Sequence, residues 1–158
     1  STTLGSTDAH RCFEESKLAL SKAGIAYCDR AIDQGDLTRR DLAATYSNRG
    51  IIYSNNGEFQ RALADHNRAA NLKPDLGQIY VNRGNVHYHL RDFDKALADY
   101  DMALGLANAP VQTALYNKGL TLIKLRRMQD AIAIFEQALA LNPDSAKIKR
   151  QLEALRAL

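Results

Sequence analysis

The sequence has few residues that interrupt helices, and it has no long apolar run. Its only prolines are Pro74, Pro110 and Pro143, whereas alanine and leucine, which favour helix, are plentiful. No apolar stretch approaches the roughly 18–20 residues that a membrane-spanning helix needs. The small and polar residues 1–6 show no signal peptide, and a start of this kind fits either the removal of a leader or trimming. We therefore expect a helical chain without a membrane span.

The sequence also lacks a large excess of charge of either sign. The 21 basic and 18 acidic residues give a net charge of only +3, and the two signs are mixed along the chain. A nucleic-acid-binding domain carries a clustered basic face. The sequence therefore predicts no nucleic-acid partner.

Motifs that carry chemistry are missing as well. The sequence contains no glycine-rich phosphate loop and no Gly-x-Ser-x-Gly elbow. His87 and His89 are two residues apart on an expected helix, so they diverge and cannot share one metal ion as residues four apart would. We expect no enzymatic activity, no metal and no cofactor.

What the sequence does contain is a repeat. Three segments share an Asn-Arg/Lys-Gly core: 46–50, 80–84 and 115–119. Their glycines, Gly50, Gly84 and Gly119, are 34 and 35 residues apart, so one residue is inserted, and we place it in 106–110. Alanines follow each glycine at fixed distances: Ala62, Ala96 and Ala131, then Ala69, Ala103 and Ala138. A helix hairpin of this length cannot bury its apolar face alone, so the repeat predicts hairpins that stack.

These positions resemble the tetratricopeptide-repeat (TPR) family, whose period is about 34 residues. The resemblance implies an all-α fold, a right-handed superhelical array of antiparallel helix hairpins (an α-solenoid) with a C-terminal capping helix. It implies one domain over 1–158, divided into a degenerate first repeat (5–42), three repeats (43–76, 77–111 and 112–145) and the capping helix (145–158).

The two ends match the repeat less well. Residues 24–32 fit the second helix of a first repeat, whereas the preceding expected helix, 8–20, fits poorly. At the other end, Ile148, Leu152 and Leu155 recur at helical spacing. This last helix is expected to cover the final hairpin with a polar outer face. The alternative is that it forms a dimer contact.

Local signals predict where helices begin and end. Thr38, Asp75, Asp92 and Asp144 are placed as helix N-caps, and Asn56-Gly57 is placed as a left-handed helix end. Arg49 and Asp65 occupy the same repeat positions as Arg83 and Asp99, and both positions change together in the last repeat. This pattern indicates ion pairs between the helices of a hairpin.

Cys12 and Cys28 are the only cysteines. The resemblance places them on the two facing helices of the first hairpin, within reach of a disulfide, which needs Cα atoms about 4.4–6.8 Å apart. A bridge would indicate an oxidising compartment, either periplasmic or secreted. The alternative is two buried thiols in a cytoplasmic protein.

The resemblance also implies a concave groove lined by the first helix of each hairpin. Asn48, Asn82 and Asn117 share one repeat position, and an amide can both donate to and accept from an extended peptide. The expected groove residues are Asn48, Ile51, Asn55, Asn82, Asn85, Tyr88, His89, Tyr116, Asn117 and Lys124. The basic residues with which one TPR subtype binds a peptide's terminal carboxylate are missing.

We therefore expect a scaffold that binds a peptide or a partner protein in this groove. The alternative is a self-associating structural module that forms homo-oligomers through its terminal helices. Fold alone does not decide between these functions.

Overall fold

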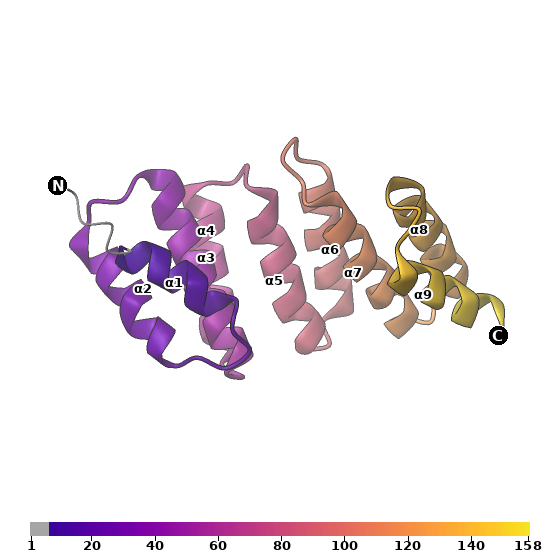
Figure 1. Ribbon diagram of the computed structural model, residues 1–158, viewed down its shortest axis with the longest axis horizontal. Helices are drawn as coiled ribbons and strands as arrows, with labels where there is room; N and C mark the ends of the chain where they lie inside the picture. Colours follow the sequence, from indigo (N-terminus) through magenta and orange to yellow (C-terminus); the bar gives the residue numbers. More distant parts are fainter. Residues whose placement is uncertain (1–6) are drawn as a thin grey trace. The chain divides into compact units, whose positions relative to one another are not determined.

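The computed structural model describes residues 7–158, which form nine α-helices and no strand (Figure 1). The helices are α1 (Asp8–Ser16), α2 (Ala23–Gln34), α3 (Arg39–Asn55), α4 (Phe59–Leu72), α5 (Gly77–His89), α6 (Phe93–Leu104), α7 (Val111–Lys124), α8 (Met128–Leu141) and α9 (Ala146–Arg156). The all-α prediction is confirmed. Residues 1–6, with the first two residues of the predicted first repeat, lie outside the described residues.

The helices pack as successive hairpins in two compact units. In unit 1, which ends at Asp75, α1 packs against α2 and α3 packs against α4. In unit 2, Leu76–Leu158, the hairpins are α5–α6 and α7–α8, and α9 packs against α8. Over residues 7–158, no helix combines the length and the hydrophobicity that crossing a bilayer requires.

Three hairpins share one close contact between a glycine on the first helix and a ring on the second. The pairs are Gly50 with His66, Gly84 with Tyr100, and Gly119 with Phe135. A Cβ on any of these glycines would lie only 2.6–2.8 Å from the ring. The rings are 0–1% exposed. The glycines that mark the repeat therefore let the two helices approach around a buried ring.

The predicted ion pairs between helices are confirmed. Arg49 donates through Nε and Nη2 to Asp65 at 2.8 and 2.9 Å, and Arg83 donates to Asp99 at 2.9 and 2.7 Å. Hydrogen bonding to Asp65 raises the pKa of Arg49, against the opposing effect of burial. Both carboxylates are buried, so these bidentate pairs belong to the interior of the hairpins.

The helix N-caps at the four predicted places are Thr38, Leu76, Asp92 and Ser145. The prediction of Thr38 was right: its hydroxyl accepts from the Asp41 N–H at 3.1 Å. The prediction of Asp75 and Asp144 was wrong by one residue. At the second of these places the hydroxyl of Ser145 caps α9 by accepting from the Ile148 N–H.

The first helix is shorter than predicted, since α1 ends at Ser16 and not at residue 20. The Ser16 hydroxyl donates to the Phe13 carbonyl at 2.6 Å and competes with the helical pattern. Further along, the Ser21 hydroxyl donates to the Glu15 carboxylate. These bonds shape the connection 17–22.

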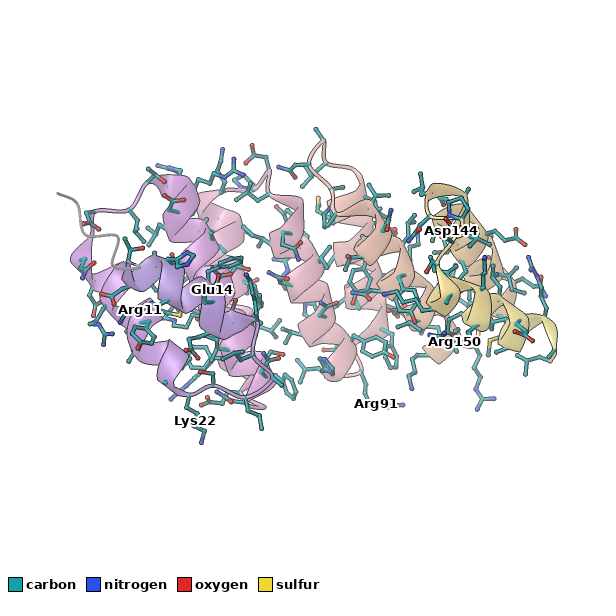
Figure 2. All side chains as sticks on the ribbon, in the orientation of Figure 1. Arg11, Glu14, Lys22, Arg91, Asp144 and Arg150 are labelled. Carbon is teal, nitrogen blue, oxygen red and sulfur yellow. A yellow bond between two sulfur atoms is a disulfide. The ribbon has the colours of Figure 1, made fainter. Side chains whose placement is uncertain are left out.

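A disulfide joins α1 to α2. It links Cys12 and Cys28, whose Cα atoms are 4.8 Å apart, and both residues are fully buried against Ile52 of α3 (Figure 2). The bridge closes the smaller of the two hairpins of unit 1, in which α1 has only 9 residues. It therefore fixes a hairpin that has little apolar surface of its own.

The core of unit 2 continues into its last helix. Ile148, Leu152 and Leu155 of α9 are 2%, 2% and 7% exposed and pack in one cluster with Phe135 and Leu122. The apolar stripe of α9 is thus used inside unit 2.

Candidate functional site

Unit 2 contains a pocket of about 240 Å³ bordered by α5, α6 and α7. Its lining residues are Asn85, Tyr88 and His89 of α5, Tyr100 of α6, and Asn117 and Leu120 of α7. Two successive hairpins contribute to it. The pocket therefore lies where α7 packs beside both helices of the preceding hairpin, α5 and α6.

Two carboxamides line the pocket and bond to each other. The Asn117 Nδ2 group donates to Asn85 Oδ1 at 2.9 Å, and the Tyr100 hydroxyl donates to the same oxygen at 2.7 Å. No other described residue bonds to Asn85 Nδ2 or to Asn117 Oδ1. One donor and one acceptor therefore remain available, and exchanging O and N in both amides would again leave one of each.

Tyr100 holds this arrangement in place. Its ring is 1% exposed and packs against Gly84, so the position of its hydroxyl is fixed by the core. Burial raises the pKa of Tyr100 above its ordinary value near 10. A phenol with the ordinary pKa already keeps its proton at neutral pH, and the shift acts in the same direction, so Tyr100 is a donor to Asn85 there.

The rim of the pocket is aromatic and aliphatic. Tyr88 is half-buried and packs edge-on against Phe93, with ring centroids 5.5 Å apart, and against His89 at 5.9 Å. His89 is exposed, and Leu120 is half-buried on α7. The site thus combines a polar centre with apolar walls, as ligand sites generally do.

Four of the predicted groove residues meet in this pocket: Asn85, Tyr88, His89 and Asn117. Asn82 lies outside it; this residue is 8% exposed and accepts from Gln78 Nε2 at 2.9 Å.

Tyr116 and Lys124 also lie outside the pocket. The Tyr116 ring packs against Phe135 with centroids 5.7 Å apart, and the Lys147 ammonium of α9 lies over it at 4.1 Å. Lys124 is exposed at the last residue of α7, one turn beyond Leu120.

The remaining predicted residues belong to α3 of unit 1. Asn48 and Ile51 are half-buried, and Asn55 is exposed. The Asn55 side chain donates to the Leu18 carbonyl at 3.2 Å, so it holds the connection after α1.

The repeat pattern does not predict that Tyr100 belongs to the site. Its repeat position was assigned to packing, because the equivalent residues are His66 and Phe135. Among these three rings, only the tyrosine has a hydroxyl, and that difference was the available signal.

Two family models, both described as tetratricopeptide repeat, match residues 42–72 and 75–144. No curated protein matches the chain in sequence.

Solved structures with similar folds include three TPR proteins. The second TPR domain of human RPAP3, solved in complex with the HSP70 peptide SGPTIEEVD, has a TM-score of 0.68 at 19% identity, over 75% of this chain and 98% of that one. A TPR protein from Parabacteroides merdae has a TM-score of 0.73 at 25% identity, over 95% of this chain and 60% of that one. YrrB, described as a TPR protein with an unusual peptide-binding site, has a TM-score of 0.67 at 25% identity, over 81% of this chain and 63% of that one.

The two family matches together cover more than half of the chain, and they contain the three glycine–ring hairpins and both Arg–Asp pairs. The chain therefore belongs to the tetratricopeptide-repeat family.

Proposed function

We propose that this protein is a non-enzymatic interaction scaffold that holds an extended peptide segment of a partner protein in the pocket of unit 2. The observation that carries the proposal is the pair of linked amides, Asn85 and Asn117, which leaves one donor and one acceptor on residues that line a partly apolar pocket.

An extended peptide presents backbone N–H and C=O groups that need partners when they are taken out of water. The free amide N–H of Asn85 suits a peptide carbonyl, and the free amide oxygen of Asn117 suits a peptide N–H. Tyr88 and Leu120 add apolar surface for one side chain of the peptide. Backbone bonds with a neighbouring apolar pocket are a recurring mode of peptide recognition.

The similar structures support a peptide as the class of ligand. The RPAP3 domain was solved with a bound HSP70 peptide, and YrrB is described by its peptide-binding site. The proposal for this chain nevertheless rests on its own residues, because sequence identity to these proteins is low and fold does not imply function.

The alternative is self-association through the terminal helices, and at the C-terminal end it needs an apolar exposed patch on α9. The apolar residues Ile148, Leu152 and Leu155 are buried within unit 2. The exposed positions of α9 include Lys147, Lys149, Arg150, Glu153 and Arg156. A charged outer face favours the peptide-binding proposal over association by this helix.

The proposal is tested by selecting peptides from a phage-displayed random library on the whole protein. Affinities of the selected peptides are then measured by fluorescence anisotropy for the wild type and for Asn117→Ala. We expect affinity to fall about ten-fold, the effect of losing one or two hydrogen bonds in a partly buried site.

Asn71→Ala is the matched control, since Asn71 is an exposed asparagine on α4. This variant should bind as the wild type does. Selection that enriches no peptide, or peptides that bind Asn117→Ala and wild type equally, would refute the proposed function.

A further inference from the structure

Three hairpin turns have the same backbone. They are the α3–α4 turn with Gly57, the α5–α6 turn with Arg91 and the α7–α8 turn with Arg126; the φ angles of these residues are 80°, 64° and 60°. In each turn the next N–H bonds back to the carbonyl five residues earlier: Glu58 to Tyr53 at 2.8 Å, Asp92 to His87 at 2.8 Å and Arg127 to Leu122 at 2.9 Å. This is the helix end for which glycine is the usual residue.

Arg91 and Arg126 are the only residues other than glycine with positive φ in the part of the chain that the structure describes. A side chain in this region is strained, and Gly57 shows that the same turn forms with glycine. Strain kept at repeated positions points to a function of the side chain itself.

The two arginines have no ion-pair partner among the described residues. The Arg91 guanidinium lies 5.5 Å from the centre of the Phe93 ring, where it stays exposed, and Arg126 is also exposed. Figure 2 shows the Arg91 side chain directed away from the helices. Neither side chain therefore offsets the strain of its own backbone through an internal salt bridge.

The two turns are neighbours in unit 2. A hollow of about 290 Å³ is lined by residues 91–95 of the first turn and by Leu125 of the second. Lys124, exposed and without a described partner, comes just before Leu125. We call Arg91, Lys95, Lys124 and Arg126 the basic edge.

The basic edge adjoins the peptide pocket. His89, which lines the pocket, is two residues before Arg91, and Leu120 is one helical turn before Lys124 on the same face of α7. A peptide that leaves the pocket toward the ends of α5 and α7 would therefore meet this edge.

We propose that the basic edge binds acidic side chains of the same partner peptide, so that the scaffold takes an acidic segment. The inference rests on the proposed function and names the charge of its ligand. Asp92 and Asp94 lie between the cations, at the start of α6, where they are favourable for the helix dipole. They would repel a continuous polyanion such as a nucleic acid, whereas carboxylates spaced along a peptide can reach the separate cations.

The test compares Arg91→Gly, Arg126→Gly and the double variant with the wild type. Binding of a fluorescein-labelled glutamate-rich peptide and of its glutamine counterpart is measured by anisotropy, and thermal unfolding is followed by circular dichroism. Each substitution should weaken binding of the glutamate peptide about three-fold, as expected for one exposed ion pair. Each should also raise the Tm by about 2–5 °C, because glycine relieves the strained turn.

Arg150→Ala is the control, since it removes an exposed and unpaired arginine of α9 that is not in a strained turn (Figure 2). It should change neither affinity nor Tm. Equal losses in Arg150→Ala and in the turn variants, equal binding of the glutamate and glutamine peptides, or no binding of either would overturn the inference. Tighter binding of a single-stranded oligonucleotide than of the glutamate peptide, lost in the same variants, would also overturn it.

The two proposals can fail separately. Library peptides that depend on Asn117 but not on Arg91 and Arg126 would keep the pocket and reject the basic edge.

Discussion

Unit 1 and unit 2 both contain hairpins in which a glycine faces a buried ring, but their other special residues differ. Unit 1 has the Cys12–Cys28 disulfide, which stabilises the fold mainly by restricting the unfolded chain. It also has a glycine in its α3–α4 turn, where the left-handed backbone carries no side-chain strain. Unit 2 has no cysteine, and it carries two strained arginines and two amides with free bonding groups. The comparison indicates that unit 1 is built for stability, whereas unit 2 keeps residues that a partner would satisfy.

The largest effect should come from removing the disulfide. The double variant Cys12→Ala, Cys28→Ala opens a bridge between residues 16 apart in sequence, which should destabilise unit 1 by about 3 kcal/mol. Native-state hydrogen exchange of the α1–α4 amides, with those of α7 and α8 as the internal control, measures the loss. An equal loss of amide protection in both units would show that they unfold together. It would contradict the difference in stability between unit 1 and unit 2.

Placing an arginine in the turn of unit 1 tests the origin of the strain. Gly57→Arg should cost about 1 kcal/mol, because it forces a side chain into the left-handed region that Arg91 and Arg126 already occupy. Urea unfolding, read by circular dichroism, gives the change. An unchanged free energy of unfolding would mean that this turn accepts arginine without strain. It would then weaken the inference that Arg91 and Arg126 are strained.

The smallest effect concerns pH and unit 2. Burial lowers the pKa of His87 below its ordinary value near 6.5, although Asp99, 3.7 Å away, acts against this. Arg83 and Lys95 lower it further, and Asp92 raises it.

In the unfolded chain His87 takes up its proton near pH 6.5, whereas the folded unit takes it up only at lower pH. Its contribution to stability is therefore complete above pH 6.5 and falls as the pH drops below that value. The free energy of unfolding is measured at a series of pH values for the wild type and for His87→Gln. The slope of this free energy against pH should differ between them by the equivalent of less than one bound proton. Parallel pH profiles would contradict this.

The sequence was sufficient to predict the features that repeat. The helix hairpins and the Arg49–Asp65 and Arg83–Asp99 pairs follow from repeated positions, because each depends on contacts within one hairpin. Which residues line the groove depends on contacts between successive hairpins, and the sequence of a single repeat does not predict these contacts. Tyr116, for example, packs under α9 and lies outside the pocket.

Two further features do not follow from the repeat pattern. Arginine does not indicate a left-handed residue, so the strain at Arg91 appears only in the backbone. The bond from Tyr100 to Asn85 likewise joins two helices of one hairpin at positions that the repeat pattern assigns to packing and to the groove.

The most direct test of the central claim is an NMR titration of the nitrogen-15-labelled protein with a peptide selected from the library. We predict that the side-chain amide signals of Asn85 and Asn117 shift on binding, with those of Asn71 unchanged. Shifts confined to residues outside α5, α6 and α7, with both pocket amides unmoved, would contradict the account.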